Sequence, residues 1–370
     1  MKEGWEYRKF ESCLVKVPKQ VQVKSKEYKK AGKFPVVSQE AELISGYWDN
    51  ETIVYKHKEP VIIFGDHTKN IKYIDFNFVV GADGTHILST KNDIIPKFFY
   101  YVLKSIKLRE LGYARHFKLL KEKYIPVPPL SEQQSIVNYL DSAFAKIDAM
   151  KANAEKALNE AKALFQASLK EMLEPKEGWE EKTLKEVSVI YGNYGLSVPS
   201  IEFNGVRYLR ITDITEWGEL NDEKVSAKID EGKDQELLVE GDILFARTGA
   251  TVGKTLMYKE EFGDCLFAGY LIRYRLKKDI IIPKFMFYIT HSNGYYKWII
   301  ENQKAAAQPN ISAKLYNEYK VSYPPLSEQQ SIVATLDSLK SKVDRLQENY
   351  DKISQECDAL KQAILRQVFE

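Results

Sequence analysis

Apolar or small side chains recur every seven residues through two long segments of the chain. One series is Leu140, Ile147, Ala154, Ala161 and Ser168, and its counterpart is Leu336, Val343, Tyr350, Cys357 and Ile364. Three residues further on, the accompanying series are Ala143, Met150, Ala157 and Leu164, and Leu339, Leu346, Ile353 and Leu360. Phe144, Leu158, Phe165 and Met172 widen the first seam on one side. Neither segment contains glycine or proline over about 40 residues, whereas globular helices average about 11–12. The pattern predicts two long helices paired as a coiled coil, in preference to two ordinary core helices.

The regions 1–127 and 176–323 have a different pattern, in which short apolar runs alternate with turn residues. The expected strands are 34–37, 61–64 and 76–80 in the first region, and 207–211, 241–245 and 271–276 in the second. A helical period over 95–111 and over 283–290 predicts one helix in each region. Both regions are therefore expected to be mixed α+β domains.

The chain is an internal duplication. The ten residues PPLSEQQSIV occur at 128–137 and again, letter for letter, at 324–333, which is 196 residues later. The five residues KEGWE at 2–6 return at 176–180, which is 174 residues later, and the two offsets together equal the chain length of 370. The two halves thus have equivalent junctions at both ends. This predicts a pseudo-two-fold arrangement with neighbouring termini and antiparallel long helices.

Each copy of PPLSEQQ predicts a helix start. Ser131 and Ser327 are expected as N-caps, with Gln134 and Gln330 completing a capping box three residues later. The expected division of the chain is a globular domain over 1–127, a helical segment over 128–175, a second domain over 176–323 and a second helical segment over 324–370.

Charge is unevenly distributed along the chain, although the net charge is only +2. Residues 1–127 carry 23 Lys/Arg and 15 Asp/Glu, a difference of +8, whereas residues 176–323 carry 20 and 22, a difference of −2. Within the second region, residues 245–323 hold 12 basic and 6 acidic side chains. This asymmetry fits a polyanionic partner that faces part of each domain.

Composition favours a soluble cytoplasmic protein. No apolar run approaches the roughly 18 residues of a membrane span, and the N-terminus lacks the hydrophobic region of a signal peptide. The three cysteines are isolated and lack CxxC spacing, and the five histidines are scattered. Neither a disulfide framework nor a metal cluster is predicted, and no cofactor is expected.

Two stretches suggest chemistry on first inspection. Residues 249–255, GATVGKT, are similar to a phosphate-binding P-loop but have three residues, not four, between the first glycine and Gly-Lys-Thr, and Thr248 stands where glycine is required. A turn that directs Arg247 and Lys254 towards an anion is the better interpretation. His67 follows Asp66, which suggests a base with a carboxylate partner, but no serine or cysteine nucleophile stands out to pair with it, so a hydrogen-bonding turn is favoured.

Two polar stretches occupy corresponding places shortly before each Pro-Pro. They are GYARHFK at 112–118 and KAAAQPNIS at 304–312. Arginine and lysine can bind guanine edges, and glutamine and asparagine can pair with adenine, so the recurrence favours DNA contact over two solvated loops.

Together these features resemble the specificity subunit of Type I restriction–modification enzymes. The matching residues are the twin PPLSEQQSIV elements, IIFGDHT at 62–68, FVVGADGTHIL at 78–88, RYLRITDI at 207–214, GDILFARTGATVGKT at 241–255 and AAAQPNIS at 305–312. The resemblance covers the whole chain. The first domain lacks the ARTGATVGK loop of the second, so those contacts are not transferred to it.

The resemblance implies a non-catalytic DNA-binding protein. Two target-recognition domains would each read one half of a bipartite site in double-stranded DNA, and the coiled coil would set the spacer. Two methyltransferase subunits using S-adenosylmethionine and ATP-driven restriction and translocase subunits would supply the catalysis. The candidate DNA-contacting residues are His67, Thr68, Lys69, Arg115, His116, Lys118, Arg247, Thr248, Lys254, Lys304, Gln308 and Asn310.

Two alternatives stay open at the level of sequence. One is a self-contained enzyme that modifies or cleaves DNA, which would bind S-adenosylmethionine or act without partners. The other is a coiled-coil scaffold for proteins, which would lack sequence-specific, salt-dependent affinity for DNA.

Overall fold

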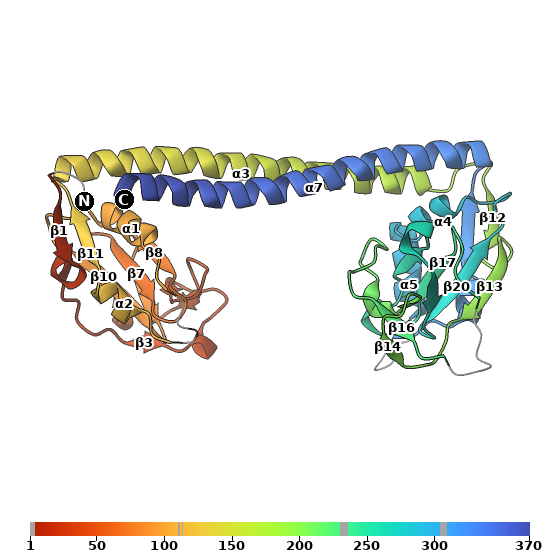
Figure 1. The fold of residues 1–370 in the computed structure, drawn as a ribbon, viewed down its shortest axis with the longest axis horizontal. Coiled ribbons are helices and arrows are strands. Elements are labelled where there is room, and N and C mark those ends of the chain that lie inside the picture. The colour runs from red at the N-terminus through yellow and green to blue at the C-terminus, as the bar shows by residue number, and fades with distance from the viewer. Residues whose placement is uncertain (1–3, 110–111, 113, 230–235, 304–308) are drawn as a thin grey trace. The chain divides into compact units, whose positions relative to one another are not determined.

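The computed structural model describes residues 4–109, 112, 114–229, 236–303 and 309–370 (Figure 1). The chain forms two compact units. Unit 1 contains residues 1–155 and 349–370, and unit 2 contains residues 156–348. The sequence predicted four consecutive segments, whereas these units are defined by contacts in space. The four-segment division therefore stays a prediction.

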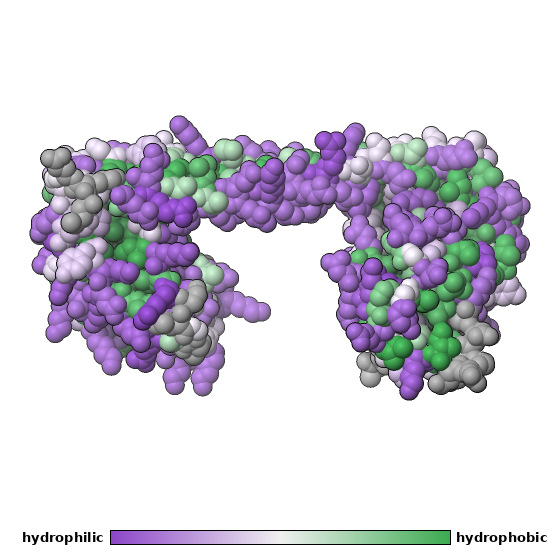
Figure 2. All heavy atoms as spheres, viewed as in Figure 1, coloured by the Kyte–Doolittle hydropathy of each residue, from purple (hydrophilic) through white to green (hydrophobic). Residues whose placement is uncertain are grey.

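Two helices of 44 residues each, α3 (Leu130–Leu173) and α7 (Leu326–Phe369), contribute to both units. Within unit 1 they run antiparallel, since Cys357 Sγ lies 3.7 Å from the carbonyl oxygen of Ile147 and Lys361 Nζ lies 5.5 Å from the ring centre of Phe144. Hydrophilic residues cover most of the visible face of these helices (Figure 2). The predicted pair of long helices is confirmed.

The buried seam of α3 differs in part from the prediction. Leu140 and Ile147 of the first series are buried, as expected. The second series is wrong, because Met150 and Leu164 are 59% and 57% exposed. Residues four positions after the first series are inside instead, and these include Leu158 and Phe165. In α7, Leu360 of the second series is likewise 47% exposed, whereas Leu336 and Cys357 of the first are buried. On a helix, the positions three and four residues after a seam residue lie on opposite sides of it. Packing against the domains buries the position four residues after the seam residue.

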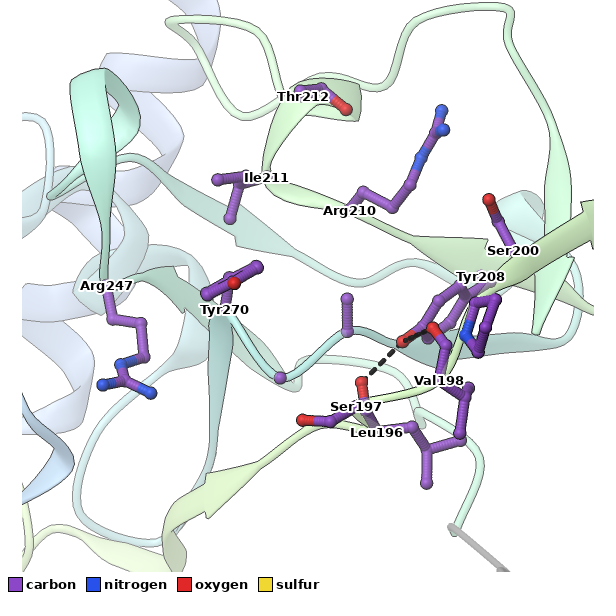
Figure 3. Close-up of a pocket in the computed structure, with 13 residues that line it drawn as sticks. Leu196, Ser197, Val198, Ser200, Tyr208, Arg210, Ile211, Thr212, Arg247 and Tyr270 are labelled. Atoms are coloured by element: carbon purple, nitrogen blue, oxygen red, sulfur yellow. Dashed lines mark hydrogen bonds between the residues drawn. The ribbon is translucent and has the colours of Figure 1, made fainter. Parts of the chain in front are cut away.

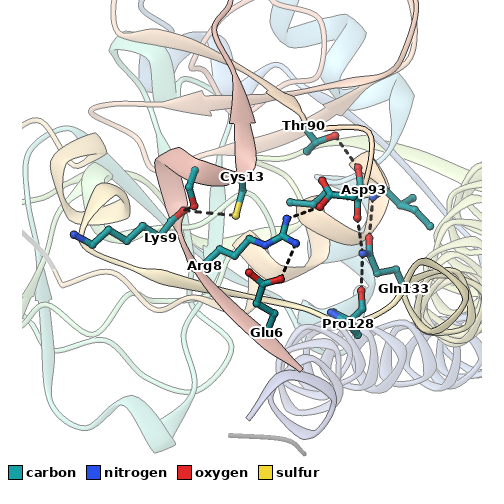
Figure 4. A network of polar contacts seen from close by, with 11 residues as sticks. Glu6, Arg8, Lys9, Cys13, Thr90, Asp93, Pro128 and Gln133 are labelled. Carbon is teal, nitrogen blue, oxygen red and sulfur yellow. Dashed lines mark hydrogen bonds and ion pairs between the residues drawn. The ribbon is translucent and has the colours of Figure 1, made fainter. Parts of the chain in front are cut away.

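The start of each long helix is also built differently from the prediction. Helix α3 begins at Leu130, so Ser131 lies inside the first turn and does not cap it. Gln133, fully buried, ties the junction together by accepting a hydrogen bond from Ile95 N–H at 2.8 Å and donating to the carbonyl oxygens of Asp93 and Pro128, both at 2.9 Å (Figure 4). The predicted capping box is replaced by a buried glutamine.

Gln329 makes the corresponding contacts at the start of α7. Its Oε1 accepts from Ile282 N–H at 2.9 Å, and its Nε2 donates to the carbonyl oxygens of Ile280 and Pro324 at 2.9 and 2.8 Å. The two copies of PPLSEQQ therefore fold alike in the two units.

Unit 1 contains a four-stranded sheet, a five-stranded sheet and a two-stranded ribbon. The order is β2-β10-β7-β8 in one sheet and β3-β9-β4-β5 in the other, where β6 also pairs with β9, and β1 pairs with β11. The strands are β1 (Glu6–Lys9), β2 (Leu14–Val15), β3 (Gln22–Val23), β4 (Phe34–Val37), β5 (Gly46–Trp48), β6 (Val54–Tyr55), β7 (Val61–Gly65), β8 (Ile71–Ile74), β9 (Phe78–Gly81), β10 (Thr85–Thr90) and β11 (Tyr124–Val127). The short helices are α1 (Pro96–Ser105) and α2 (Phe117–Lys121).

Unit 2 repeats the four-stranded sheet in the order β13-β20-β17-β18, and β12 pairs with β21 as β1 pairs with β11. Two further ribbons, β14-β16 and the parallel pair β15-β19, complete it. The strands are β12 (Glu180–Thr183), β13 (Ser188–Tyr194), β14 (Ser200–Glu202), β15 (Arg207–Leu209), β16 (Val225–Ala227), β17 (Ile243–Ala246), β18 (Thr255–Met257), β19 (Cys265–Phe267), β20 (Leu271–Leu276) and β21 (Lys320–Tyr323). The short helices are α4 (Pro283–Ile289), α5 (Asn293–Asn302) and α6 (Ala313–Asn317).

Helices α1 and α4 attach each domain to the long helices in the same way. Each begins with a proline, whose fixed φ suits the first helical position. The hydroxyl of Tyr101 in α1 donates to Asp141 of α3, and the hydroxyl of Tyr288 in α4 donates to Asp337 of α7 at 2.5 Å. Helix α1 ends at Ser105, short of the predicted residue 111, and the remaining predicted strands and helix are present with small shifts at their ends. No helix among the described residues is long and apolar enough to cross a membrane.

Candidate nucleic-acid interface

In unit 1 the predicted residues 67–69 form the tight turn between β7 and β8. Hydrogen bonds from Gly65 N–H to Asn70 O and from Lys69 N–H to Gly65 O, at 2.8 and 2.9 Å, close it. Lys69 has a φ of +60°, an uncommon conformation for a residue other than glycine. The turn therefore has a defined shape at the end of a buried strand.

Gln39 holds this turn from a neighbouring segment. Its Oε1 accepts from His67 N–H at 3.0 Å, and its carbonyl oxygen accepts from Thr68 Oγ1 at 2.6 Å. The segment is itself fixed by Lys72 of β8, whose buried ammonium donates to Ser38 O at 2.9 Å. Burial lowers the pKa of Lys72. The turn is thus anchored to the second sheet of unit 1.

The second predicted stretch of unit 1 packs directly on this turn, through Asp66. The carbonyl oxygen of Asp66 accepts from His116 N–H at 2.8 Å, and its Oδ1 accepts from Phe117 N–H at 2.8 Å. Arg115 Nε lies 3.9 Å from Asp66 Oδ2. Residues some 50 positions apart, which the sequence analysis selected separately, therefore form one surface.

Asp66 is the charged centre of this surface. Its carboxylate is 6% exposed, and His86 Nε2 lies 3.3 Å from Oδ2, with the His86 ring stacked on Phe117 at 4.0 Å between centres. Burial raises the pKa of Asp66, but the Phe117 N–H and the neighbouring histidines outweigh it, and the net pKa is lowered. The ionised carboxylate therefore holds Arg115, Phe117 and His86 around the turn.

The corresponding place in unit 2 is the loop between β17 and β18, residues 247–254. Ile311 N–H donates to Arg247 O at 2.9 Å, as His116 N–H donates to Asp66 O in unit 1. Gly249 N–H donates to Pro309 O at 3.0 Å, and Thr248 and Asn310 form an isolated β-bridge. The loop and the segment before α6 are thus joined in the same way as the turn and the segment before α2.

An aromatic ring restrains the guanidinium group of Arg247 in this loop. Its guanidinium carbon lies 5.0 Å from the ring centre of Tyr194, within the range of cation–π attraction. The hydroxyl of Tyr194 accepts from Ala313 N–H at 2.9 Å, which fixes the ring on the first turn of α6. The guanidinium is therefore held against a tyrosine that is itself anchored.

Beside Arg247 lies a cavity of about 710 Å³ (Figure 3). Arg247 and Tyr270 border one side, and the segment from Leu196 to Ser200 borders the other. Tyr270 is 59% exposed, and Tyr208 donates through its hydroxyl to Leu196 O at 2.5 Å. The cavity combines aliphatic and aromatic walls with two arginines, Arg247 and Arg210, the second of which is paired with Asp213 and Glu223.

Lys254 is already partnered within the protein, since its ammonium lies 2.7 Å from Glu216 Oε1 and its side chain is 19% exposed. The stretch 249–255 also leads into strand β18, where a P-loop leads into a helix. The phosphate-binding alternative is therefore excluded by the fold.

The remaining candidate residues differ in how far their side chains are exposed. Arg115 is 78% exposed, and Lys118, Thr68 and Asn310 also lie at the surface. His116 is 1% exposed, with Nδ1 3.1 Å from Asp66 O, so it supports the surface from within. Lys304 and Gln308 lie outside the described residues.

Sequence reasoning missed several residues that shape these surfaces: Gln39, His86, Tyr194 and Tyr270. Gln39 and Tyr194 act from segments with no motif, so only their three-dimensional contacts identify them. Tyr270 stands between Gly269 and the buried strand β20, and an exposed aromatic residue at a strand end is a signal that could have been used.

The family model described as the Type I restriction modification DNA specificity domain matches this chain twice, over residues 2–160 and 176–355. The EcoBI specificity subunit of Escherichia coli is 24% identical over 313 residues, which cover 74% of this chain and 65% of that relative, so the chain spans just under two thirds of its length. The EcoR124I/EcoR124II specificity subunit of Escherichia coli is 26% identical over 349 residues, covering 86% of this chain and 82% of the relative.

A solved chain from structural work on complex assembly and conformational transition of the type I R-M system has a similar fold. Its TM-score is 0.71 at 20% identity, and the alignment covers 100% of this chain and 98% of that chain. The twin sheets, the equivalent junctions and the two family matches lead to one conclusion: the chain belongs to the family of Type I restriction–modification specificity subunits, and it carries two DNA specificity domains.

Proposed function

We propose that each unit reads one half of a bipartite site in double-stranded DNA through the surface described above. The observation that carries this is the equivalence of the two surfaces. Each consists of the loop after the third strand of a four-stranded sheet, joined by a backbone hydrogen bond to the segment before a short helix. Folded alike but lined by different side chains, they suit two different half-sites.

The two surfaces offer complementary kinds of contact. In unit 1, Arg115 and Lys118 are exposed cations on a domain with an excess of basic residues, which suits phosphate contacts. In unit 2, Arg247 and the exposed amide of Asn310 can form paired hydrogen bonds with base edges in the major groove. Thr68 lies in the turn of unit 1 and Thr248 directly follows Arg247 in the loop of unit 2, so their hydroxyl groups can add single hydrogen bonds to DNA.

The partners are proposed from the second pair of equivalent features, the helix junctions. Around Gln133, Arg8 pairs with Glu6 at 2.7 Å (Figure 4), and around Gln329, Lys182 pairs with Glu180 at 3.0 Å. Two like surfaces suit two copies of one partner. In this proposal they bind two methyltransferase subunits in the cytoplasm, restriction and translocase subunits join the full complex, and the partners alone carry catalysis and cofactors.

The long helices are proposed to set the spacer between half-sites. An α-helix rises about 1.5 Å per residue and B-DNA about 3.4 Å per base pair, so four added residues correspond to roughly 6 Å, or nearly two base pairs.

The test is co-expression with a methyltransferase encoded beside this chain, followed by mapping of methylated adenines. The expected result is a bipartite site. Substitutions at Arg115 and Lys118 should weaken binding without changing the preferred sequence, and substitutions at Thr248 and Asn310 should relax recognition of one half only. A contiguous site, or equal loss at both halves from every variant, would contradict the proposal. Methylation by this chain alone would instead identify it as an enzyme.

A further inference from the structure

The five arginines of residues 176–323 differ in whether the protein itself satisfies their guanidinium groups. Four have acidic or carbonyl partners. Arg210 pairs with Asp213 at 2.7 Å and Glu223 at 3.0 Å, Arg273 with Glu236 at 3.0 Å, Arg275 with Asp242 at 2.8 Å, and Arg207 donates to Asn221 O at 2.7 Å and Glu223 O at 2.8 Å. Arg247 alone has neither an ion pair nor a side-chain hydrogen bond to any described residue.

Arg247 is nevertheless held in one position. Its backbone N–H donates to Tyr270 O at 3.0 Å and its carbonyl oxygen accepts from Ile311 N–H at 2.9 Å. Its guanidinium lies over the anchored ring of Tyr194. A long cation usually loses much rotamer freedom on binding, and this one has lost part of it beforehand. The side chain is thus organised for a planar partner that the protein does not supply.

The Nε of Arg247 strengthens this conclusion. It is buried and has no hydrogen-bond partner among the described residues; the same holds for Arg207 Nε and for Arg273 Nε and Nη1, but those two side chains have partners at their other donors. Buried donors without a partner are rare in folded proteins, and an acceptor brought by a ligand is one way to satisfy such a group. Arg247 also borders the cavity together with Tyr270 (Figure 3).

We infer that Arg247 determines specificity by reading a guanine in the half-site of unit 2, an inference that rests on the proposed function. The guanidinium fork presents two parallel N–H groups, which match the O6 and N7 acceptors of guanine in the major groove. A phosphate contact requires charge more than orientation, and the exposed cations of unit 1 suit it better. The contact with the Tyr194 ring restrains the position of the guanidinium, as base recognition requires.

The experiment measures binding of the methyltransferase complex to DNA duplexes randomised at each position of the mapped site. Arg247→Lys retains the charge and removes the fork. We expect the preference for guanine at one position to fall about 5- to 150-fold, with preferences elsewhere in both half-sites unchanged. The matched control is Arg275→Lys, which alters an arginine of unit 2 that pairs with Asp242 and Glu236 and does not line the cavity, so it should leave every preference as it is.

Tyr194 supplies a second test, because it acts through Arg247 as a positioning residue. Tyr194→Phe keeps the ring over which the guanidinium lies but loses the hydroxyl contact with Ala313, so it should keep most of the guanine preference. Tyr194→Leu removes the ring and should weaken the preference at the same position as Arg247→Lys does, with no change in the other half-site.

Several results would contradict the role of Arg247 or the proposed function on which it rests. A wild-type site without guanine in either half, or an Arg247→Lys complex with unchanged preferences or uniformly weaker binding, would overturn the inference. Absence of a bipartite site in the wild-type complex would overturn the proposed function itself. Loss of both half-sites by Arg247→Lys, with Tyr194→Phe intact, would assign Arg247 to folding and overturn the inference as well.

Discussion

The two units fold alike, yet they hold their candidate DNA surfaces by opposite means. In unit 1 a buried carboxylate, Asp66, gathers histidine, arginine and backbone donors around a short turn. In unit 2 a cation, Arg247, lies over an aromatic ring at the same place. Figure 2 shows more hydrophobic residues on the visible face of the second domain than of the first. One fold can therefore present two chemically different surfaces, because the loops carry recognition and the sheet only positions them.

The largest effect is expected from lengthening both long helices. One heptad inserted after Glu155 in α3 and one after Glu348 in α7 keeps the period of the buried seam and adds about 10 Å, or about three base pairs. We expect both half-sites to be retained with a longer spacer, and methylation of the original site to be lost. The measurement is the map of methylated adenines. An unchanged spacer would mean that the helices do not set it.

A large loss of stability is expected where the two units are most alike. Gln133→Leu leaves Ile95 N–H and two carbonyl oxygens without partners, and it should destabilise unit 1 by about 2–4 kcal/mol. Gln329→Leu should destabilise unit 2 to a similar extent. Hydrogen exchange of each unit measures both changes.

The neighbouring glutamines provide matched controls for this comparison, because Gln134 and Gln330 are exposed. Gln134→Leu and Gln330→Leu should change stability by less than about 0.5 kcal/mol. Equal losses from all four variants would show that the buried hydrogen bonds are not the cause.

A moderate effect should distinguish charge-based contact in unit 1 from base reading in unit 2. Lys118→Gln removes an exposed cation, so the slope of log K against log salt should become shallower by about 0.9, with no change in the preferred sequence. The measurement is a salt titration of DNA affinity. Glu122→Gln, a change of opposite sign at an exposed position near the end of α2, serves as a control for nonspecific charge effects. Altered base preference after Lys118→Gln would assign this lysine to base contact.

The smallest effect is expected from pH, because the stability of the two units should fall in different pH ranges. Burial lowers the pKa of His291, which stacks on Trp217 in unit 2, below its usual value of 6.5. The unfolded chain then takes up a proton before the folded one, so unit 2 should lose stability as pH falls below about 6.5. The pKa of Asp66 is lowered from 3.8, so its contribution to unit 1 is present above about 3.8 and is lost at more acid pH.

Hydrogen exchange around residues 214–220 and 65–69, followed from pH 7 to about pH 2, separates these two responses. His291→Phe should remove the response of unit 2 while leaving unit 1 as it is. Simultaneous loosening of both units near pH 6 would contradict the assignment to His291.

The sequence by itself determined the features that depend on repetition and period. The twin PPLSEQQSIV elements established the duplication, and the absence of glycine and proline with a seven-residue period established the two long helices. These are local properties, since a helical period and a helix-compatible composition act over neighbouring residues. The candidate stretches stay a prediction as DNA contacts, although the structure joins residue 116 to Asp66 and residues 309 and 311 to the loop 247–254 at matched places in each half.

Only the tertiary structure decided which segments meet and which side chains face inwards. Asp66 contacts the segment at 115–117, and Arg247 contacts the segment at 309–311, through backbone hydrogen bonds that leave no trace in sequence spacing. The choice of Leu158 and Phe165 over Met150 and Leu164, and of Gln133 over Gln134, likewise depended on what packs against each helix. Adjacent positions on a helix are equally able to form either contact, and only the surface placed opposite selects between them.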